Sequence, residues 1–465
     1  MTELPTTLPI ELHRGSPTPL AVQLADTLRA AAAAGHLRSG DRLPSTRALA
    51  DRLEVSRTVT AAAYEQLHAE GWITGRHGSG TFVTTAPPGA RTAAPRQRTA
   101  NLPQPDRLDL VPGAPWVDGL DRAAWRRAWR AAADAPPLLR PQRAGLPEYR
   151  TAVAEHLLRH RGLVLASGLD QDLLATGGTT AAVAEIALAV LRPGDVVAVE
   201  EPGYQRAVQA LRAAGVRVVP APVDPNGLAV AAVPPNVRAV YCSPSHQYPL
   251  GGRMSAATRV ALVERAREKG WLVIEDDYDG ELRYDVAPLP LLVALAPDVV
   301  VHLGTTSKIF TSTLGIGWMV APPEVVAGVL AHRDGTGTGP SAAGQRVLVE
   351  LARHGDLGRH LRRLRRELST RRELVVAALD GAGLTTLGDD AGAHVVVPLP
   401  SLAAEQQVVR EGMNVGVTLD GLARHHDGRP TWHGIGLGYT ACTRQELLAV
   451  LPEVVRLLVA ATAAG

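Results

Sequence analysis

The sequence predicts a multidomain protein in which a small, mostly helical domain with a β-hairpin precedes a large α/β domain with a mostly parallel sheet. The 465 residues are 46% hydrophobic, which is enough for more than one core. Residues 86–105 are rich in Pro, Ala and Arg without apolar periodicity, as expected of a linker. Helical patterns then alternate with Val-rich segments, as in parallel α/β proteins. The expected division is 1–84, a linker at 85–107, and 108–465.

Composition excludes several classes of protein. The formal net charge of +2 selects no partner by itself. The chain has two cysteines, Cys242 and Cys442, and neither lies in a CxxC motif, which fits a reducing cytosol. The N-terminus lacks a basic segment followed by an apolar core, and charged residues, Pro or Gly interrupt every apolar stretch before membrane-spanning length. We therefore expect a cytoplasmic protein with no membrane partner.

The first eighty-four residues contain signals for three short helices. We expect the first helix to be capped by Thr18 and to end at Gly35. Ser45 and Ser56 are the expected caps of the next two, TRALADRL and RTVTAAAYEQLHAE, with a tight turn at residues 54–55.

The third helix is predicted to expose side chains at its N-terminal end. With Val59, Ala63 and Leu67 pointing inward, Arg57, Thr58 and Thr60 remain near the exposed start of the helix. A helix-turn-helix presents hydrogen-bonding side chains to base edges and phosphates in this way. WITGRHGSGTFV follows as a hairpin whose tip carries arginine and histidine.

Charge does not distinguish a DNA-binding domain from a generic three-helix bundle, because residues 1–84 hold eight arginines and eight acidic residues. The order of motifs does. LPSTRALA, VSRTVTAAAYEQL, EGWI and GSGTFV closely resemble the winged helix-turn-helix of GntR-type regulators. The resemblance implies binding to double-stranded operator DNA through these residues: Ser45, Arg47, Ser56, Arg57, Thr58, Thr60, His77 and Gly78.

Lysine is rare in this chain, which otherwise uses arginine for positive charge. The two lysines are Lys269 and Lys308. Lys269 fits the exposed end of a helix, whereas Lys308 directly follows the apolar segment VVVHLG. Arginine cannot lose its proton in a protein, but a lysine amine can become neutral and act as a nucleophile. Position 308 therefore indicates amine chemistry.

Polar clusters follow three predicted strands. EEPGYQ follows VVAV, EDDYDGELRY follows WLVI, and the Lys308 segment follows VVVHLG. The carboxyl ends of parallel strands meet at one sheet edge, where ligands bind. A neutral lysine, a carboxylate and an aromatic ring suit pyridoxal 5'-phosphate, and GGTT at residues 177–180 offers a helix N-terminus for its phosphate. Taken singly, a lysine is usually a surface charge, EDDYD a loop and GGTT an ordinary cap.

The order of these clusters is informative. GLPEYRTAVAEHLLRHRG, EEPGY, SPSHQYPLGG, EDDYDGELRY and GTTSK resemble fold-type I aminotransferases, and especially the MocR subfamily, in which this pyridoxal-phosphate-dependent transferase-like fold is fused behind a GntR-type head. The resemblance covers nearly the whole chain. It implies a homodimer with pyridoxal 5'-phosphate as cofactor.

The resemblance also assigns roles to residues. It implies that Lys308 forms the Schiff base, that Asp276 partners the pyridine nitrogen with Asp277 as the alternative, and that Tyr278 reaches the phenolic oxygen. Tyr204 is expected to stack on the ring. The residues expected to line the phosphate are Gly178, Thr179 and Ser307.

The chain departs from the family pattern at several positions. Gly315 replaces the usual phosphate-binding arginine, Thr180 and Ala181 replace a pair of glutamines, and Gly436 stands where a carboxylate-binding arginine is expected. Without that arginine, an amino acid substrate would lack orientation. The sequence thus favours a regulator that senses pyridoxal phosphate, an amine or an amino acid, without full transamination turnover. The alternatives are a working aminotransferase with an accessory DNA-binding domain and a regulator that has lost the cofactor.

Arg140 aligns with the tyrosine that a partner subunit usually lends to the phosphate, and Arg143 is close by. We expect one of them to contact the phosphate site of the partner subunit, although both could be ordinary surface arginines. No metal site is expected, because His425, His426 and His433 lack cysteine partners and HExxH spacing. The arginine-dense segment LGRHLRRLRRELSTRREL is expected to be an amphipathic helix.

Overall fold

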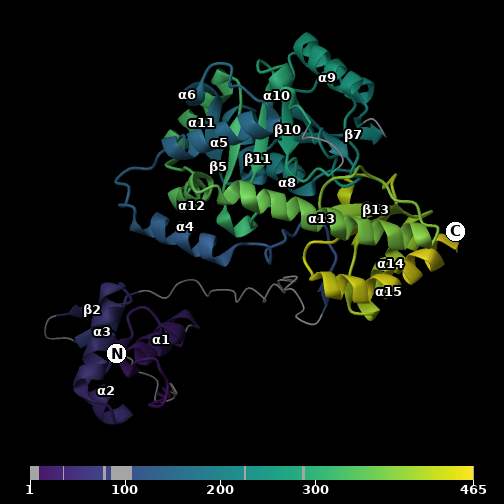
Figure 1. Ribbon diagram of the computed structural model, residues 1–465. Coiled ribbons are helices and arrows are strands. Elements are labelled where there is room, and N and C mark those ends of the chain that lie inside the picture. The colour runs from purple at the N-terminus through teal and green to yellow at the C-terminus, as the bar shows by residue number, and fades with distance from the viewer. Residues whose placement is uncertain are drawn as a thin grey trace. The chain divides into compact units, whose positions relative to one another are not determined.

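The computed structural model describes residues 10–34, 36–76, 80–84, 107–224, 227–284 and 289–463. The chain divides into two compact units, Met1–Leu102 and Pro103–Gly465 (Figure 1). The expected linker at 85–107 lies almost entirely outside the described residues, so its ends stay a prediction. No helix of the described ranges has the length and hydropathy that a membrane span needs.

The small unit consists of three helices and a three-stranded antiparallel sheet of order β1-β3-β2. Its core gathers apolar side chains from all three helices and from the hairpin. The elements are α1 (Leu20–Ala33), β1 (Arg42–Leu43), α2 (Thr46–Leu53), α3 (Arg57–Ala69), β2 (Ile73–Arg76) and β3 (Gly80–Val83).

The expected helix caps of the small unit are only partly correct. Ser45 caps α2, since its side chain accepts a hydrogen bond from the Ala48 amide, and Glu54 forms the tight turn in the left-handed conformation. Ser56 occupies the cap position of α3 without a side-chain cap bond. The expectation for Thr18 is wrong: α1 begins at Leu20 after Pro19, with no side-chain cap. The predicted end at Gly35 lies outside the described residues.

An eight-stranded sheet of order β5-β12-β11-β10-β9-β6-β7-β8 forms the centre of the large unit. Strands β11, β10, β9, β6 and β7 run parallel, while β5, β12 and β8 pair antiparallel, so the sheet is mostly parallel as predicted. The strands are β5 (Leu173–Thr176), β6 (Val196–Glu201), β7 (Arg217–Asp224), β8 (Gly227–Leu228), β9 (Ala239–Cys242), β10 (Leu272–Asp277), β11 (Val300–Thr305) and β12 (Gly317–Val320).

Helices cover both faces of this sheet (Figure 1). Successive residues of β10 illustrate the two faces, because Val273 belongs to one apolar core and Ile274 to the other. The helices of this part are α4 (Arg122–Asp134), α5 (Pro147–Arg161), α6 (Leu169–Asp172), α7 (Thr179–Ala189), α8 (Gln205–Ala213), η1 (Val230–Ala232), α9 (Ala256–Lys269), α10 (Leu292–Leu295), η2 (Ser312–Leu314), α11 (Pro323–Thr336) and α12 (Ala342–Arg353).

A smaller α/β layer completes the large unit. Its sheet has the order β13-β16-β15 and is antiparallel, and β14 pairs in parallel with β4. Its elements are β4 (Leu108–Asp109), α13 (Asp356–Gly381), β13 (His394–Pro398), α14 (Leu402–Asn414), β14 (Val417–Thr418), β15 (Asp420–Gly421), η3 (Leu422–His425), β16 (Gly434–Gly438) and α15 (Arg444–Ala463).

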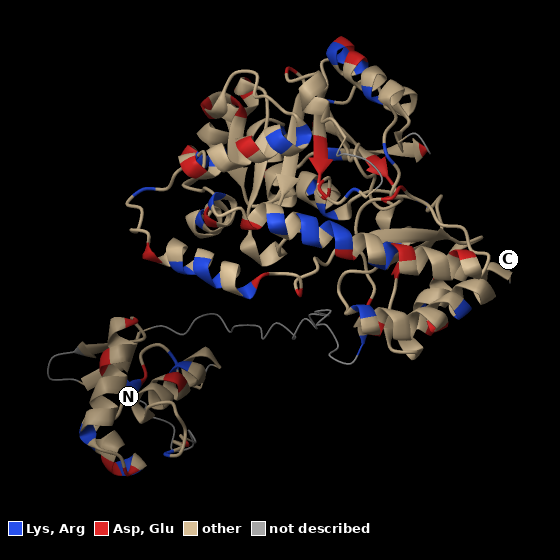
Figure 2. Ribbon diagram, in the orientation of Figure 1, with Lys and Arg blue, Asp and Glu red and all other residues tan. Residues whose placement is uncertain are grey.

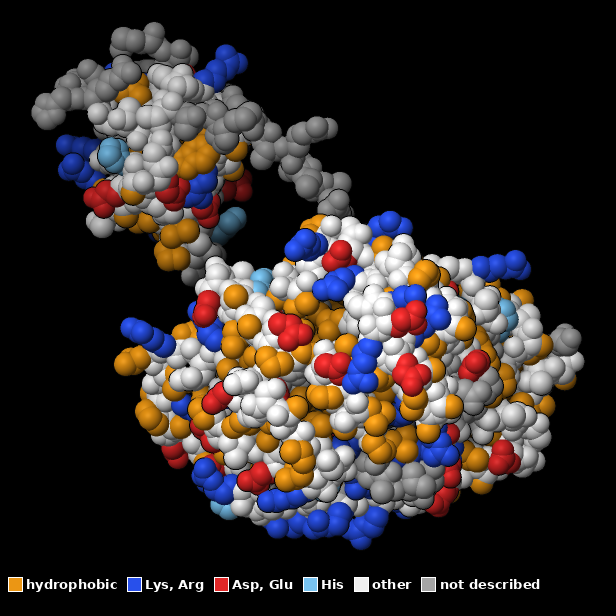
Figure 3. All heavy atoms as spheres, turned by 90° about the horizontal axis from the view of Figure 1, so that it is seen from above, with side chains coloured by type: hydrophobic (Ala, Val, Ile, Leu, Met, Phe, Trp, Pro, Cys, Tyr) orange, Lys and Arg blue, Asp and Glu red, His pale blue; other side chains and the backbone are white. Residues whose placement is uncertain are grey.

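Two secondary predictions about charged residues are confirmed. The arginine-dense segment lies within α13, whose ribbon carries a long run of blue in Figure 2. Leu361, Leu364 and Leu368 form the buried side of this amphipathic helix. Lys269 is the last residue of α9 and pairs with Glu268. On the face in Figure 3, basic and acidic side chains are interspersed among apolar ones, and neither sign of charge dominates.

Candidate functional site

The polar clusters that follow β6, β10 and β11 lie at one edge of the sheet. These strands run parallel, and β10 pairs directly with β11 so that Asp276 lies opposite Leu303. The carboxyl ends of these strands therefore bring three segments toward one another, as the sequence predicted. These are the end of β10, the segment of Lys308 after β11 and the segment of Tyr204 after β6.

Lys308 lies in a half-buried position at this edge. Its Nζ donates a hydrogen bond to the carbonyl oxygen of Gly113 at 2.6 Å. Burial lowers the pKa of the Lys308 amine, while Asp279 and Asp276 act in the opposite direction and Arg206 lowers it further. The amine is therefore more readily neutral than an exposed lysine. Arg206, which the sequence reasoning missed, brings a cation close to the site.

Asp276 is 3% exposed and has one engaged and one unengaged carboxylate oxygen. Oδ2 accepts a hydrogen bond from the Tyr241 hydroxyl, whereas buried Oδ1 has no hydrogen-bond partner among the described residues. Burial raises the pKa of Asp276 to about 7. A protonated pyridine nitrogen would supply the missing donor and favour the ionised carboxylate. The residues present therefore fit pyridoxal phosphate.

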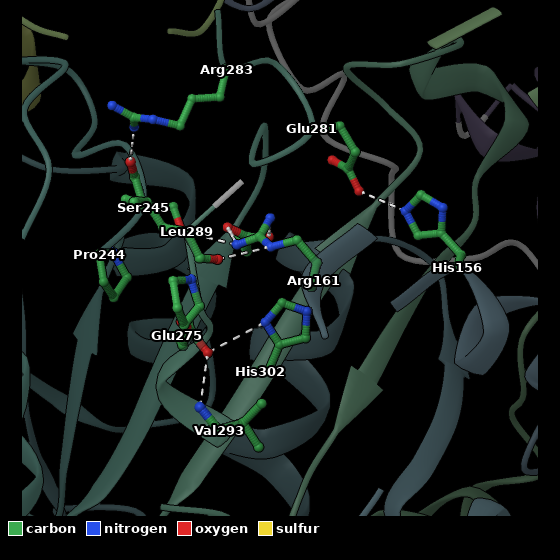
Figure 4. A network of polar contacts seen from close by, with 12 residues as sticks. His156, Arg161, Pro244, Ser245, Glu275, Glu281, Arg283, Leu289, Val293 and His302 are labelled. Atoms are coloured by element: carbon green, nitrogen blue, oxygen red, sulfur yellow. Dashed lines mark hydrogen bonds and ion pairs between the residues drawn. The ribbon is translucent and has the colours of Figure 1, made fainter. Parts of the chain in front are cut away.

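Asp277, the alternative partner, is engaged elsewhere. Its carboxylate accepts hydrogen bonds from Arg161 at 2.6 and 3.1 Å, and both side chains are buried. Burial alone would raise the pKa of Asp277, but Arg161 holds it below the ordinary value. Arg161 also donates to Ser245 and to the Leu289 carbonyl (Figure 4). Asp277 thus anchors the loop after β10 to α5 and leaves Asp276 as the available carboxylate.

Tyr278 contacts two residues that the sequence reasoning did not single out. Its hydroxyl lies 3.0 Å from Nδ1 of His246, and the same nitrogen lies 2.8 Å from Oδ2 of Asp279. Both residues stand inside motifs that carry the family resemblance, SPSHQYPLGG and EDDYDGELRY, so the signal was present in the sequence. What the sequence lacked was the pairing between the two loops.

Tyr204 lies at the N-cap position of α8, half-buried. Its hydroxyl shares a hydrogen bond of 3.0 Å with the Thr180 hydroxyl, and its ring packs edge-on against Tyr248 with centroids 5.9 Å apart. Tyr248 also packs edge-on against Tyr278, His394 and His425, so it joins the loops around the lysine. The sequence reasoning missed this central aromatic residue.

Gly178, Thr179 and Ser307 come together as predicted. Gly178 is the N-cap of α7 with φ of +104°, a conformation that favours glycine, and Thr179 starts the helix. A Cβ at position 178 would lie 3.3 Å from the Thr305 hydroxyl, which donates to the Ser307 hydroxyl at 2.9 Å. The N-terminus of α7 and the hydroxyls of Thr305 and Ser307, which are groups that suit an anion, thus lie side by side.

Two positions that depart from the family pattern have physical explanations. Gly315 ends η2 with φ of +63°, where an arginine would be strained although a Cβ there would have no other atom within 4 Å. Gly436 lies in β16, and a Cβ there would approach the Pro112 ring to 3.1 Å. Pro112, next to Gly113, occupies the space beside the expected carboxylate-binding position.

The two arginines of the segment before α5 differ. Arg143 bonds within its own chain, to Asp334 at 3.1 Å and to the Thr338 carbonyl. Arg140 is exposed, has no polar contact among the described residues, and follows the exposed Leu139. Arg143 is therefore a structural residue, which argues against its role at a partner's phosphate site.

The candidate DNA-binding surface comprises the first turns of α2 and α3. Arg47, Arg57 and Thr58 are exposed, as are Ser45 and Ser56. His77 and Gly78 of the hairpin tip lie outside the described residues.

The exposure predicted for Thr60 is wrong. Thr60 is 0% exposed, and its hydroxyl donates to the Thr46 and Arg57 carbonyls at 2.8 and 3.0 Å. It lies on the buried face of α3 with Ala63 and Leu67, whereas Val59 is only half-buried. The bond to Thr46 holds the first turns of the two helices side by side.

Histidines of the C-terminal loop have local partners. His425 pairs with Asp420 at 3.1 Å, and His426 Nδ1 lies 3.1 Å from the Leu422 carbonyl. Within the described ranges, no group of three or more potential ligands is arranged to hold a metal ion.

Known proteins resemble both units. Residues 20–83 match the bacterial regulatory proteins of the gntR family, and residues 118–423 match aminotransferase class I and II. The pyridoxine biosynthesis transcriptional regulator PdxR of Corynebacterium glutamicum is 34% identical over 96% of this chain and 98% of its own. The probable rhizopine catabolism regulatory protein MocR of Rhizobium meliloti is 32% identical over 92% and 91%.

A solved structure agrees with the fold of the large unit. The kynurenine aminotransferase of Pyrococcus horikoshii, in complex with PMP, has a TM-score of 0.68 and 25% identity over 76% of this chain and 91% of that one. The matches span both units and nearly full length. The chain therefore belongs to the MocR-type GntR family of transcriptional regulators, in which a helix-turn-helix domain precedes a fold-type I aminotransferase-like domain.

Proposed function

We propose that this chain is a pyridoxal-phosphate-binding, sequence-specific DNA-binding regulator that acts in the cytoplasm as a homodimer. The large unit senses pyridoxal phosphate itself or an amine or amino acid that reacts with it. The observation that carries this proposal is Asp276, whose buried Oδ1 lacks a partner among the described residues while the amine of Lys308 lies at the same sheet edge.

Pyridoxal phosphate, when bound, supplies an aldehyde that reacts with amines and a ring that absorbs visible light. Lys308 would provide the amine and Asp276 would hold the proton on the ring nitrogen. Tyr204 would cover the ring and Tyr278 would reach its phenolic oxygen. The phosphate would lie at the N-terminus of α7, between Gly178, Thr179 and Ser307.

Arg140 is the proposed replacement for the phosphate ligand absent at Gly315. Amides and hydroxyls alone lack the charge-assisted, bidentate bonds of an arginine. The exposure of Arg140 and Leu139 is consistent with a segment that a second subunit covers. Arg140 of one subunit would then bind the phosphate held by the other.

The proposed DNA contacts come from the exposed first turns of α2 and α3 and from the hairpin tip. Two such heads in a dimer would suit repeated or palindromic half-sites. Thr60 is left out because its hydroxyl is buried and bonded within the unit. The proposed contacts are Ser45, Arg47, Ser56, Arg57, Thr58, His77 and Gly78.

A working aminotransferase is the second candidate. The lysine, carboxylate and tyrosine at one sheet edge, and the fold shared with an aminotransferase, favour it. The absence of an arginine at position 436 argues against it, and a Cβ there would make a tight contact of 3.1 Å with the Pro112 ring. A regulator that responds to its cofactor needs binding and a conformational change rather than turnover.

A mobility-shift assay tests the regulator directly. The probe is a duplex containing the DNA upstream of the gene for this chain, titrated with and without pyridoxal phosphate. The proposal expects specific binding that competitor DNA of unrelated sequence does not remove, with an affinity that depends on pyridoxal phosphate or an added amine. Binding that is absent or equally strong on unrelated DNA would contradict it.

A further inference from the structure

The proton positions around Tyr278 follow from the partners of one nitrogen. Nδ1 of His246 lies 2.8 Å from the Asp279 carboxylate and 3.0 Å from the Tyr278 hydroxyl. A carboxylate is an acceptor, so a short contact with Nδ1 requires a proton on that nitrogen. With Nδ1 donating to Asp279, the imidazole cannot accept the phenolic proton of Tyr278.

The pair is buried and closely packed. His246 and Asp279 are each 3% exposed. A Cβ at Gly392 would lie 2.1 Å from Cε1 of His246, so only glycine allows this close packing. Gly392 leads into β13, and the His246 and His394 rings lie 5.4 Å apart. The imidazole is therefore wedged between the loop after β9 and the smaller layer.

We propose that His246 and Asp279 are positioning residues for Tyr278: the carboxylate fixes a proton on Nδ1, and this keeps the phenolic hydroxyl a donor for a ligand bound at Lys308. The inference rests on the proposed binding of pyridoxal phosphate. The acceptor would be the ligand's phenolic oxygen. In the absence of a ligand, the Tyr278 hydroxyl can donate its hydrogen bond to Asp279. Burial raises the pKa of the Tyr278 phenol, and the charge of Asp279 raises it further.

Asp279 also affects the pKa of Lys308, and this effect distinguishes two explanations of its role: charge alone, or action through His246. Its charge raises the pKa of the Lys308 amine, against the effect of burial. If Asp279 acted through charge alone, its removal would make the amine lose its proton more easily. If it acts through His246, its removal frees Nδ1 to accept the Tyr278 proton, and the ligand loses its donor. The other charged or titratable groups around the pair include Asp276, Tyr248, Arg206, Tyr284, His394, Asp420 and Tyr439.

The measurement is the pH midpoint of the visible absorbance of the full-length protein with pyridoxal phosphate, together with the Kd for pyridoxal phosphate. A phenolic oxygen without a donor carries negative charge less readily, so the midpoint moves to higher pH. In His246→Leu, Asp279 loses its Nδ1–H partner and accepts the hydrogen bond of the Tyr278 hydroxyl instead, so the ligand loses its donor. Tyr278→Phe removes the donor itself. Each change should raise the midpoint by about one to two pH units, the size expected for one charge-assisted hydrogen bond. Because both changes remove the same hydrogen bond, from Tyr278 to the ligand, the midpoint of the double variant should shift no further than that of Tyr278→Phe alone.

Two further variants sharpen the test. His246→Asn keeps an N–H near the position of Nδ1 and should restore the wild-type midpoint. Asp279→Asn should raise the midpoint, whereas a charge-only role predicts a lower one. If His246→Leu does not fold, Asp279→Asn with Tyr278→Phe carries the test. His156→Leu is the matched control, since His156 is also buried and pairs with Glu281 at 3.1 Å, and it should leave the midpoint unchanged.

The outcomes separate this inference from the proposed function. No visible band in the wild-type protein would contradict the binding of pyridoxal phosphate at Lys308. A wild-type band whose midpoint is the same in His246→Leu, or a lower midpoint in Asp279→Asn, would overturn the positioning role and leave the proposed function standing. Additive shifts in the double variant would likewise overturn it.

Discussion

The amine of Lys308 donates a hydrogen bond to the backbone carbonyl of Gly113, 195 residues earlier in the chain and 2.6 Å away. The first segment of the large unit thus closes one side of the lysine site. The preceding residue, Pro112, lies against Gly436 of β16, in the sheet of the smaller layer. One short segment therefore contacts both the lysine and the strand that carries Gly436.

This arrangement predicts little turnover of amino acids. Incubation of the pyridoxal-phosphate-loaded protein with common amino acids should give at most partial reaction, because no arginine at position 436 orients a substrate carboxylate. The measurement is keto acid formed per protein chain. Many turnovers per chain would favour the aminotransferase instead.

Asp276 predicts a pH-dependent stability of the cofactor-free protein. Burial raises its pKa in the folded state to about 7. A group with a raised folded pKa contributes stability below its unfolded pKa and loses it as the pH rises through the folded value. Asp276→Asn should therefore melt at a higher temperature than the wild type at pH 8, and this advantage should vanish at pH 4. The same cofactor-free variant should bind pyridoxal phosphate more weakly. An advantage that is independent of pH would contradict this account of Asp276.

Asp277 predicts the opposite behaviour. Its folded pKa is lowered by Arg161, so its stabilising contribution is present above the unfolded pKa and is lost as the pH falls through the folded value. Asp277→Asn leaves the Arg161 charge buried without its partner and should destabilise the fold by about 3–5 kcal/mol near neutral pH. Denaturant unfolding measures this loss. If Asp277→Asn is as stable as the wild type while Asp276→Asn unfolds, the two carboxylates have been assigned the wrong way round.

The two exposed arginines of the small unit predict losses of DNA affinity. Arg47→Ala and Arg57→Ala should each weaken operator binding by about 1–3 kcal/mol if they contact bases, and by less if they touch only phosphate. Arg52→Ala, at the other end of α2, is the matched control and should bind nearly as the wild type does. Unchanged affinity in the Arg47→Ala, Arg57→Ala double variant would refute this surface.

Thr58 and Thr60 form a second matched pair. Thr58→Val should weaken DNA binding without loss of stability, because Thr58 is exposed. Thr60→Val leaves the Thr46 carbonyl without its side-chain donor and should destabilise the small unit by about 1 kcal/mol. Thermal melting and mobility shift, measured on both, should show opposite patterns.

Arg140 predicts a link between cofactor binding and dimerisation. Arg140→Ala should weaken both retention of pyridoxal phosphate and self-association, because a ligand shared between subunits couples the two equilibria. Arg143→Ala should reduce stability through the lost bonds to Asp334 and Thr338. Wild-type cofactor retention in Arg140→Ala would eliminate the cross-subunit role.

The sequence predicted those features that depend on local pattern. Alternating Val-rich segments and helices predict the mostly parallel sheet, and a sheet of this kind brings Lys308 and Asp276 to one edge. The left-handed Glu54 turn and the Ser45 cap also follow from short-range signals. The lysine itself was conspicuous because arginine supplies nearly all other positive charge.

The misses depend on helical phase and on long-range pairing, and so does the choice between Asp276 and its alternative, Asp277. Val59 and Thr60 are neighbours, so a small error in the helical phase predicted Thr60 as exposed and Val59 as inward-pointing, whereas Thr60 is buried and Val59 half-buried. Asp276 and Asp277 could be separated only by knowing that Arg161, 116 residues before Asp277, reaches one of them. His246 meets Asp279 across 33 residues, and no spacing rule relates the two loops.

The central claim is that Lys308 is the amine that binds pyridoxal phosphate. The most direct measurement is borohydride reduction of the protein with pyridoxal phosphate, followed by mass spectrometry of its peptides. With two lysines in the chain, the assignment has a built-in control. We expect a visible band that borohydride abolishes, the added mass on Lys308, and neither in Lys308→Ala, while Lys269→Ala behaves as the wild type. The added mass on Lys269, or a band that survives in Lys308→Ala, would contradict the account.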